Sequence, residues 1–333
     1  MDTLTAKTQV IEASLELVEK GLVARTWGNV SARISEDEFV ITPSGMAYED
    51  LTPDDIVTVR IDGLSYEGDI KPSSEKGVHA AAYALRPEIN FIVHTHQDYA
   101  TALSALGRGI RGYAASYADV IGRAVPCAEY GLSSTKKLAD NVAACVGMYA
   151  DSKAFLMTNH GTVCLGEDRD DAMKVALTLE DMCKERYAEI AGRSFDRELP
   201  EFYETKESPE GTYIFVKSPQ VRLMSQAGDQ RRVYVDDEAQ FLGSGIRCVS
   251  ADRSTSSVMA AARRYGAVFV KGRGALVYGP DAEEANALRM IVEKGALASY
   301  VAAKSHDAHA VPVTSSVLEH IIYKVSYSKR KDA

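Results

Sequence analysis

Apolar residues along the first 200 positions follow two different spacings, which predicts a mixture of helices and strands. Between Thr5 and Gly21 they recur every three or four positions, as on the buried face of a helix that ends at a glycine. Short apolar runs at 39–42, 56–61 and 90–95 have the length of strands. The same patterns predict further helices at 99–106, 134–148 and 170–191 and further strands at 153–157 and 162–165. This mixture indicates a layered domain of the α/β or α+β class that ends near residue 200.

A change of composition near residue 205 marks the expected domain boundary. The segment 201–211 is rich in Glu, follows Pro200 and contains Pro209. The chain has 333 residues, which is more than a usual domain of ~100–200 residues. We therefore expect one domain at 1–205 and a second, smaller one at 206–333.

An internal repeat emerges when the chain is shifted by 113 residues, so that 157–190 lies over 270–303. Six residues are then identical: Gly161, Gly166, Asp168, Ala172, Glu180 and Tyr187 match Gly274, Gly279, Asp281, Ala285, Glu293 and Tyr300. Any two segments of strand, turn and helix share some of this similarity. As a repeat, it predicts that 206–333 is a degenerate partial copy of the first domain.

Composition and charge exclude several classes of protein. With 46% hydrophobic and 26% charged residues, the chain is typical of soluble globular proteins. The formal net charge is −9 and the one basic run, 329–331, is at the end, so we expect no nucleic-acid partner. There is no apolar run of ~18 residues and no leader pattern at the start, which predicts a cytoplasmic protein without a membrane partner.

Candidate metal ligands follow two of the predicted strands. His94 and His96 come at the end of the run Phe91-Ile92-Val93, and alternation along a strand sends both side chains to one face. His160 lies in a turn after another strand, from which a third imidazole can converge. Three neutral imidazoles suit a divalent ion such as zinc. The alternative is that these histidines are hydrogen-bonded packing residues.

Glu75 is the candidate acid or base. It follows two serines at the start of a helix that is expected to close before Pro87, where it can act as a general base or a displaceable metal ligand. Alternatively, it only complements the positive end of the helix dipole. His79 lies one turn further on the same face and either supports Glu75 or packs in the core.

Three short polar segments offer groups that bind an anion. They are Gly28-Asn29-Val30-Ser31, Thr42-Pro43-Ser44-Gly45 and Ser73-Ser74. Hydroxyls, exposed backbone amides and a helix N-terminus hold phosphate without many cationic side chains. Each segment taken singly is an ordinary turn or cap.

Five motifs together carry a family resemblance: Gly-Asn-Val-Ser from 28, Thr-Pro-Ser-Gly from 42, Pro-Ser-Ser-Glu from 72, His-Thr-His from 94 and Asn-His-Gly from 159. In this order and spacing, residues 5–195 resemble the class II aldolase and adducin family, and within it the branch that contains L-fuculose 1-phosphate aldolase. The resemblance implies a three-layer α/β/α domain, here followed by a smaller C-terminal domain.

The resemblance also implies a site. Zn²⁺, or another divalent metal such as Mn²⁺ or Co²⁺, would bind His94, His96 and His160, and Glu75 would be the catalytic acid/base. The phosphate of a small phosphorylated sugar would be held by Asn29, Thr42, Gly45, Ser73 and Ser74.

The region before Val125-Pro126-Cys127 bears on the reaction. In the similar aldolases a nearby Tyr donates a proton in the site of a neighbouring subunit, and Tyr113 and Tyr117 are both candidates, with Tyr117 preferred. In the similar L-ribulose 5-phosphate 4-epimerases this stretch carries a catalytic Asp, and Asp119 stands at that spacing. Those epimerases usually carry Asp where this chain has Glu75, which favours the aldolase.

Three functions follow, in order of preference. The first is a zinc-dependent aldolase, a carbon–carbon lyase that cleaves a ketose 1-phosphate to dihydroxyacetone phosphate and an aldehyde. The second is a sugar-phosphate 4-epimerase or decarboxylase with the same enolate chemistry. The third is a non-catalytic interaction module, as in adducin. The family commonly forms ring tetramers, so we expect a homo-oligomer, in which residues from about 212 onward shape the contacts.

Overall fold

The computed structural model describes residues 1–333 except 24–25, 194, 196–201, 306 and 332–333, and omits the side chains of 326–331. It divides into two compact units, Met1–Glu185 (unit 1) and Arg186–Ala333 (unit 2). The division falls inside helix α6, Arg169–Ala191. The predicted boundary segment 201–211 begins at Glu201, outside the described residues, and its remainder contains strand β10, Tyr203–Ser208. Four of the six β10 residues are exposed at the sheet edge, where charged side chains are favoured, which explains its linker-like composition.

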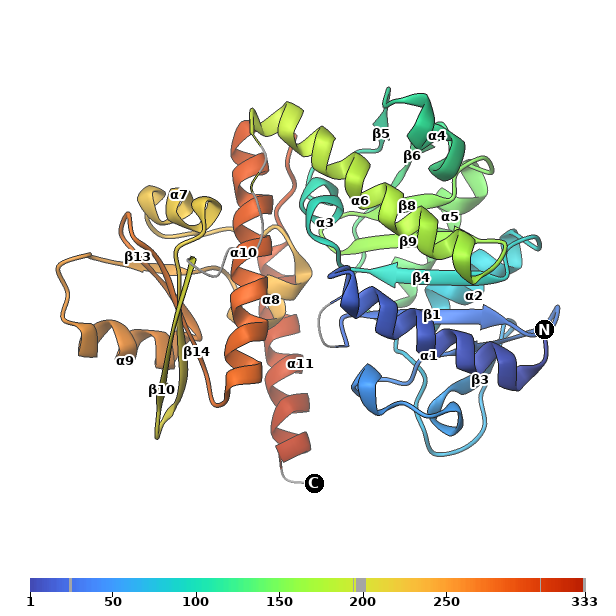
Figure 1. Cartoon of the computed structure of the whole chain (residues 1–333), viewed down its shortest axis with the longest axis horizontal. Helices are drawn as coiled ribbons and strands as arrows, with labels where there is room; N and C mark the ends of the chain where they lie inside the picture. The colour runs from blue at the N-terminus through green and yellow to red at the C-terminus, as the bar shows by residue number, and fades with distance from the viewer. Residues whose placement is uncertain (24–25, 194, 196–201, 306, 332–333) are drawn as a thin grey trace. The chain divides into compact units, whose positions relative to one another are not determined.

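Unit 1 is built on a mixed seven-stranded sheet of order β3-β2-β1-β4-β9-β8-β7, in which only the β7–β8 pair is parallel (Figure 1). Its strands are β1 Gly28–Arg33, β2 Glu38–Ile41, β3 Val57–Arg60, β4 Phe91–Thr95, β7 Cys127–Ala128, β8 Ala154–Met157 and β9 Gly161–Gly166. A small ribbon pairs β5 Ile110–Arg111 with β6 Ala124–Val125. The helices are α1 Thr3–Glu19, η1 Tyr48–Asp50, η2 Pro53–Asp55, α2 Lys76–Leu85, α3 Asp98–Ser104, α4 Ala115–Ile121, α5 Lys136–Met148 and most of α6.

Helices cover both faces of this sheet, which gives the expected three layers. One core joins side chains of α2 and α5, such as Tyr83 and Val142, to sheet residues such as Ile92 and Phe155. Figure 1 shows α1 and α6 on the opposite face, where α1 buries Val10 and Leu17. Because Ile92 and His94 share one face of β4, the first candidate ligand lies on the α2 side of the sheet.

The segment Gly28-Asn29-Val30-Ser31 is not the turn expected from its composition, because it opens β1. This strand lies between β2 and β4, and its four central residues are all buried. A strand buried on both faces lacks the alternation of apolar and polar residues that identifies strands in sequence.

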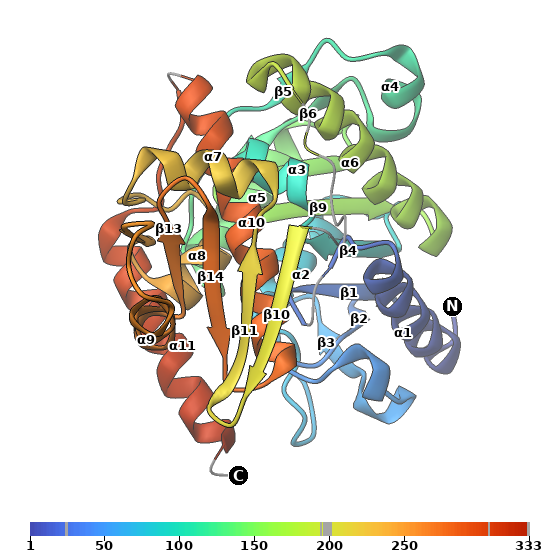
Figure 2. The same ribbon diagram turned by 60° about the vertical axis from the view of Figure 1, so that its left-hand side comes forward.

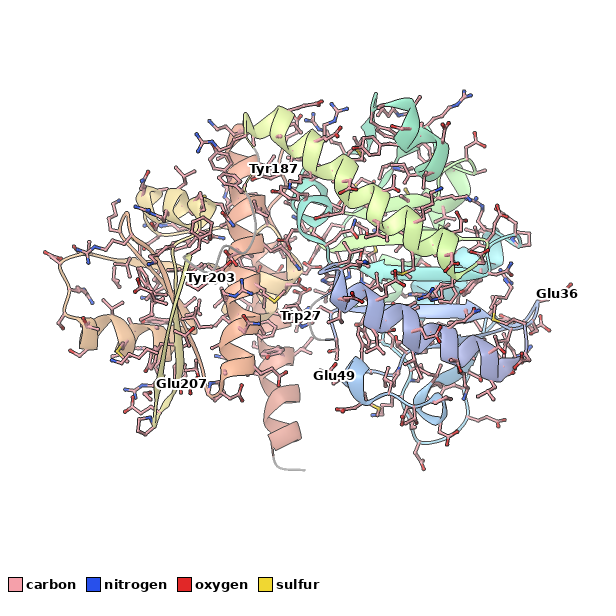
Figure 3. All side chains as sticks on the ribbon, viewed as in Figure 1. Trp27, Glu36, Glu49, Tyr187, Tyr203 and Glu207 are labelled. Atoms are coloured by element: carbon pink, nitrogen blue, oxygen red, sulfur yellow. The ribbon has the colours of Figure 1, made fainter. Side chains whose placement is uncertain are left out.

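Unit 2 contains a second sheet, of order β10-β11-β14-β13-β12 (Figure 2). After β10 come β11 Gly211–Val216, β12 Arg247–Val249, β13 Ala267–Val270 and β14 Gly274–Gly279. Its helices are α7 Pro219–Ala227, α8 Asp236–Leu242, α9 Thr255–Tyr265, α10 Ala282–Lys304 and α11 Val313–Lys331. Figure 3 locates Tyr203 and Glu207 on β10. In the described part of both units, no helix combines the length and the apolar character needed to cross a membrane.

The shift of 113 residues found in the sequence also relates whole strands and helices of the two units. Strands β8 and β9 and helix α6 begin and end 113 residues before β13, β14 and α10, respectively. The preceding strands behave alike, since β7 is parallel to β8 and β12 is parallel to β13. The second sheet thus has the strand order and directions of β1-β4-β9-β8-β7 in the first.

Candidate metal centre and active site

The register of three strands positions the candidate site. In the pairing of β1 with β4, Asn29 lies opposite His94, and in the pairing of β4 with β9, Val163 lies opposite His94. Residues directly opposite each other share a face of the sheet. The turn that leads into β9 holds His160, which therefore reaches the same end of the sheet as His94 and His96.

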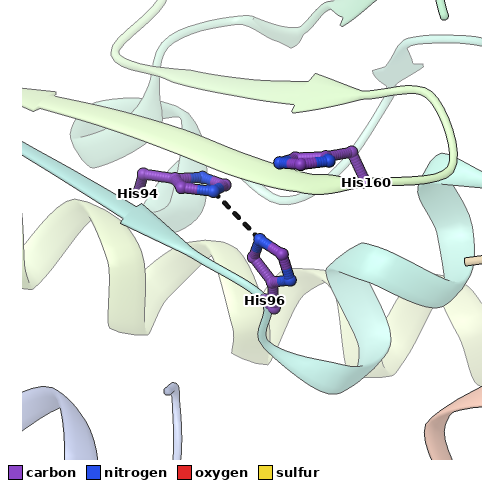
Figure 4. A group of neighbouring side chains, drawn as sticks. All are labelled: His94, His96 and His160. Atoms are coloured by element: carbon purple, nitrogen blue, oxygen red, sulfur yellow. Dashed lines mark hydrogen bonds between the residues drawn. The ribbon is translucent and has the colours of Figure 1, made fainter. Parts of the chain in front are cut away.

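Three buried imidazoles converge at this end of the sheet (Figure 4). One ring nitrogen each from His94, His96 and His160 lies within 4.8 Å of the others, and no other such group of three ligands occurs among the described residues. Nε2 of His94 is 2.9 Å from Nε2 of His96, and the rings of His94 and His160 are stacked with centroids 5.1 Å apart. These are the three histidines whose convergence the sequence pattern predicts.

The Nδ1 atoms of His94 and His160 each contact an oxygen atom of the protein. Nδ1 of His94 lies 2.8 Å from the backbone oxygen of Thr162, so that Nδ1 donates a hydrogen and, in the neutral ring, Nε2 keeps its lone pair. Nδ1 of His160 lies 3.1 Å from Oγ of Ser133. Partners of this kind set the orientation of metal-binding histidines. The role of Ser133 as a partner of His160 was not predicted, because Ser133 belongs to none of the five sequence motifs.

Gly161 allows the turn to come close to the ligands. A Cβ at this position would lie 2.5 Å from the backbone oxygen of Thr95 and 3.0 Å from Cδ2 of His96. Any residue with a side chain would push the turn away from β4 and separate His160 from its partners.

The donor set fits a divalent cation. The fixed tautomer of His94 directs a nitrogen lone pair at Nε2 of His96, and two imidazole nitrogens in this position are better satisfied by a shared cation than by each other. The three histidines could therefore bind a metal ion. Imidazole ligands suit zinc among the common divalent ions.

Glu75, at the N-cap position of α2, directs its carboxylate between two of these imidazoles. Oε2 is 2.9 Å from Nε2 of His94 and Oε1 is 3.1 Å from Nε2 of His160. Nδ2 of Asn29 donates a hydrogen bond of 3.3 Å to Oε2. Burial alone would raise the pKa of Glu75, but the adjacent His160 and His94, in their protonated forms, lower it well below its usual value. Beside these charged rings the carboxylate is ionised and can accept a proton or bind a metal.

Four of the five candidate phosphate ligands lie on connected segments near Glu75. The backbone N–H of Ser73 donates to the oxygen of Thr42, and Oγ of Ser73 accepts the N–H of Glu75. Oγ of Ser74 accepts a hydrogen bond from Ser134. Gly45 is exposed in the neighbouring loop with φ of 75°, which favours glycine. Asn29, the fifth, contacts Glu75 and His79 directly.

Tyr117 and Asp119 lie on α4 and contact neither Glu75 nor the three histidines in the hydrogen bonds of the described residues. The hydroxyl of Tyr117 donates to Oε1 of Glu185 on α6 at 2.7 Å. This hydrogen bond raises the pKa of Tyr117 to about 12. Asp119 is exposed. Tyr113, the other tyrosine considered, donates its hydroxyl hydrogen to the backbone oxygen of Gly122.

Comparisons with known proteins show the family of this chain. Residues 8–187 match the model of the Class II Aldolase and Adducin N-terminal domain. The L-ribulose-5-phosphate 4-epimerase UlaF of Salmonella paratyphi C is 34% identical over 189 residues, which cover 54% of this chain and 82% of UlaF. The solved structure of an L-fuculose 1-phosphate aldolase is similar with a TM-score of 0.53 and 32% identity, over 59% of this chain and 92% of that one. The chain is therefore a member of the class II aldolase and adducin family.

Proposed function

We propose that the chain is a zinc-dependent enzyme that breaks a carbon–carbon bond of a phosphorylated ketose, and that its reaction is the 4-epimerisation of a ketopentose phosphate. One observation carries this proposal: the ionised Glu75 carboxylate lies between His94 and His160 in a buried three-histidine cluster. Similarity to UlaF over most of its length supports the choice of epimerisation.

The residues around the cluster suit the steps of such a reaction. A divalent metal on the three histidines would supply a Lewis acid for the substrate's carbonyl group. Asn29, Thr42, Gly45, Ser73 and Ser74 would hold the phosphate and fix the distance from it to Glu75. Transfer of the 4-hydroxyl proton to the Glu75 carboxylate lets the C3–C4 bond break, which leaves an enediolate and an aldehyde. If the aldehyde rotates to present its other face before the bond reforms, C4 is inverted.

The same bond cleavage gives an aldolase if the aldehyde leaves and the enediol carbon is protonated. Two observations favour this second candidate. The acid/base position is occupied by Glu75, with a side chain long enough to reach both His94 and His160. The solved L-fuculose 1-phosphate aldolase is similar to this chain at 32% identity. In either reaction Tyr117 and Asp119 are proposed to act from α4 in the site of a second copy within a homo-oligomer.

The first test measures bound metal and products together. The purified protein is analysed for metal and incubated with a panel of ketopentose 5-phosphates and ketose 1-phosphates, while NMR follows the sugars. About one zinc per chain with a 4-epimer as product supports the main proposal. Zinc with release of dihydroxyacetone phosphate replaces it with the aldolase. A protein without affinity for divalent metal would contradict both and favour an interaction module.

Glu75→Gln tests the acid/base directly. The amide keeps the size of the side chain but cannot take up the proton, so we expect turnover to fall ~10²–10⁴-fold with metal retained. The matched control is Glu238→Gln, which makes the same change at a fully buried carboxyl group of unit 2 and should leave turnover at pH 7 unchanged. Activity of the Glu75 variant within about twofold of the parent chain would show that another group moves the proton.

A further inference from the structure

A continuous row of polar side chains lies behind the candidate site, between strand β1 and helix α2. Strand β1 contributes Asn29 and Ser31, two residues apart, and α2 with its N-cap contributes Glu75, His79 and Tyr83, each four residues apart. A spacing of two on a strand and of four on a helix keeps each set on one face. The two sets therefore face each other along their whole length.

The contacts in this row alternate between the strand and the helix. Asn29 bonds Glu75 on one side at 3.3 Å and Nε2 of His79 on the other. Ser31 Oγ lies 2.6 Å from Nδ1 of His79 and 2.8 Å from the hydroxyl of Tyr83. Each strand residue thus bridges two successive helix residues.

The contacts define one arrangement of hydrogens along the row. Nδ2 of Asn29 faces Oε2 of Glu75 and Oδ1 of Asn29 faces Nε2 of His79, so the amide donates to the carboxylate and accepts from the ring. Nε2 of His79 must then donate, which leaves Nδ1 to accept the hydrogen of Ser31. Ser31 in turn accepts the hydroxyl hydrogen of Tyr83. The orientation of each group is determined by its neighbour.

Burial makes this arrangement hard to reverse. Asn29, Ser31, His79 and Tyr83 are all buried, so water cannot replace a lost partner. Burial lowers the pKa of His79 to about 3, with a further contribution from His94, so the ring stays neutral and keeps one donor and one acceptor. At the far end the guanidinium of Arg33 lies 4.7 Å from the centre of the Tyr83 ring and donates to the Tyr83 backbone oxygen.

We propose that Tyr83, Ser31 and His79 are positioning residues that fix the amide orientation of Asn29 and, through it, hold the Glu75 carboxylate between His94 and His160. A reversed Asn29 amide would direct its oxygen at the carboxylate and repel it. This proposal extends the proposed function, since it concerns how the proposed acid/base is held.

Kinetics of Ser31→Ala give the first test. The variant removes the hydrogen that Nδ1 of His79 accepts, so His79 can adopt the other tautomer and Asn29 can reverse. We expect kcat to fall ~10–100-fold with KM changed less than about threefold, and Ser31→Thr, which keeps the hydroxyl, to restore most of it. Tyr83→Phe removes only the outermost contact and should lower kcat ~2–5-fold.

The matched control is Ser14→Ala, which removes a buried hydroxyl of α1 that bonds the Val10 backbone oxygen, outside this row. It should lower thermal stability as Ser31→Ala does, with kcat unchanged. If Ser31→Ala and Ser14→Ala have the same kcat when both are folded and bind metal, the positioning proposal is wrong.

Histidine NMR gives a test that needs no substrate. In the zinc-loaded full chain labelled with ¹⁵N-histidine, we expect His79 to be the neutral Nε2–H tautomer, and Ser31→Ala to shift it toward Nδ1–H. An Nδ1–H or doubly protonated His79 in the parent chain would overturn the proposal. If instead no substrate of the panel reacts while His79 has the expected tautomer, the proposed function fails and the hydrogen-bonded row stands.

Discussion

The five strands of the unit 2 sheet have the order and directions of five strands in unit 1, but among the described residues only unit 1 carries a candidate metal site. The register identifies the corresponding positions: Val163 and Thr162 pair with His94 and Thr95, as Leu276 and Ala275 pair with Phe215 and Val216. By this register, unit 2 has Phe215, Lys217 and Arg273 where unit 1 has His94, His96 and His160. We propose that unit 2 is a partial copy in which the framework was kept and the metal ligands were lost.

Two pairs of identical residues at matched positions of the two units have a structural explanation. A Cβ on Gly161 would lie 2.5 Å from the Thr95 oxygen, and one on Gly274 would lie 2.1 Å from the Val216 oxygen. Asp168 and Asp281 each accept a backbone N–H three residues on, at the starts of α6 and α10. These identical residues are therefore explained by tight turns and helix caps. The metal ligands of unit 1 have no such structural role, so their counterparts in unit 2 could differ.

Exchange of ligands for their unit 2 counterparts should have the largest effect. We expect His94→Phe or His160→Arg to weaken metal binding at least ~100-fold and to abolish turnover, because two imidazoles cannot hold the ion as three do. Metal titration of the purified variants measures this. Phe215→His is the control, since one added imidazole should not create a site in unit 2. Stoichiometric metal in either unit 1 variant would show that the ion binds elsewhere.

A smaller effect should follow from alanine at the two matched glycines. Gly161→Ala and Gly274→Ala each force a backbone shift that we expect to cost about 2–4 kcal/mol in their own unit. Trp27, the one tryptophan of the sequence, lies in unit 1 (Figure 3) and reports unfolding there by fluorescence, while circular dichroism follows both units. Gly161→Ala should also weaken metal binding, and Gly274→Ala should not.

Gly147→Ala in α5 is the control for these two substitutions, because the nearest atom to its Cβ would be 3.8 Å away. It should be neutral or slightly stabilising. Equal metal affinity in the Gly161 and Gly274 variants would refute the assignment of Gly161 to the ligand geometry.

The smallest effect concerns the buried carboxyl group of unit 2. Burial raises the pKa of Glu238 to about 8, against a hydrogen bond from Gln230 that lowers it, whereas the pKa of Glu75 in unit 1 is lowered. The folded state thus binds the proton more tightly than the unfolded chain, so this group stabilises the fold below about pH 4.5 and the stability is lost as the pH rises to about 8.

Glu238→Gln should remove this dependence. We expect the variant to be about 1–2 kcal/mol more stable than the parent chain at pH 9 and no more stable at pH 5, measured by denaturant unfolding followed by circular dichroism. Parallel stability curves for the two proteins from pH 5 to 9 would show that Glu238 does not titrate in the folded chain.

Local patterns predicted much of unit 1 from the sequence. Helix α1 follows the predicted periodicity, and the runs around Phe91 and Phe155 are strands, because short-range spacing determines which side chains share a face. Strand β1 was not predicted because it is buried on both faces, and strand β10 was not predicted because it is an exposed edge strand.

The candidate site was predicted only in part. The histidines and Glu75 belong to recognisable motifs, but the contact of Asn29 with Glu75 depends on the register of β1 against β4, which no local pattern encodes. Glu75 and His79 were predicted to share one face of a helix, and Tyr83, which continues this spacing of four residues, was not singled out. The sequence did not indicate that Ser31 lies between His79 and Tyr83.

Helix α6 carries a practical lesson for anyone who wishes to express the two units separately. The helix has no break between Glu185 and Arg186, where the units divide, and its final turns belong to unit 2, in which Tyr187 is buried and bonds the Leu297 oxygen. A fragment that stops near residue 205 would leave this tyrosine without its partner and expose an apolar surface, and so invite aggregation. The safer gene fragment stops before Tyr187.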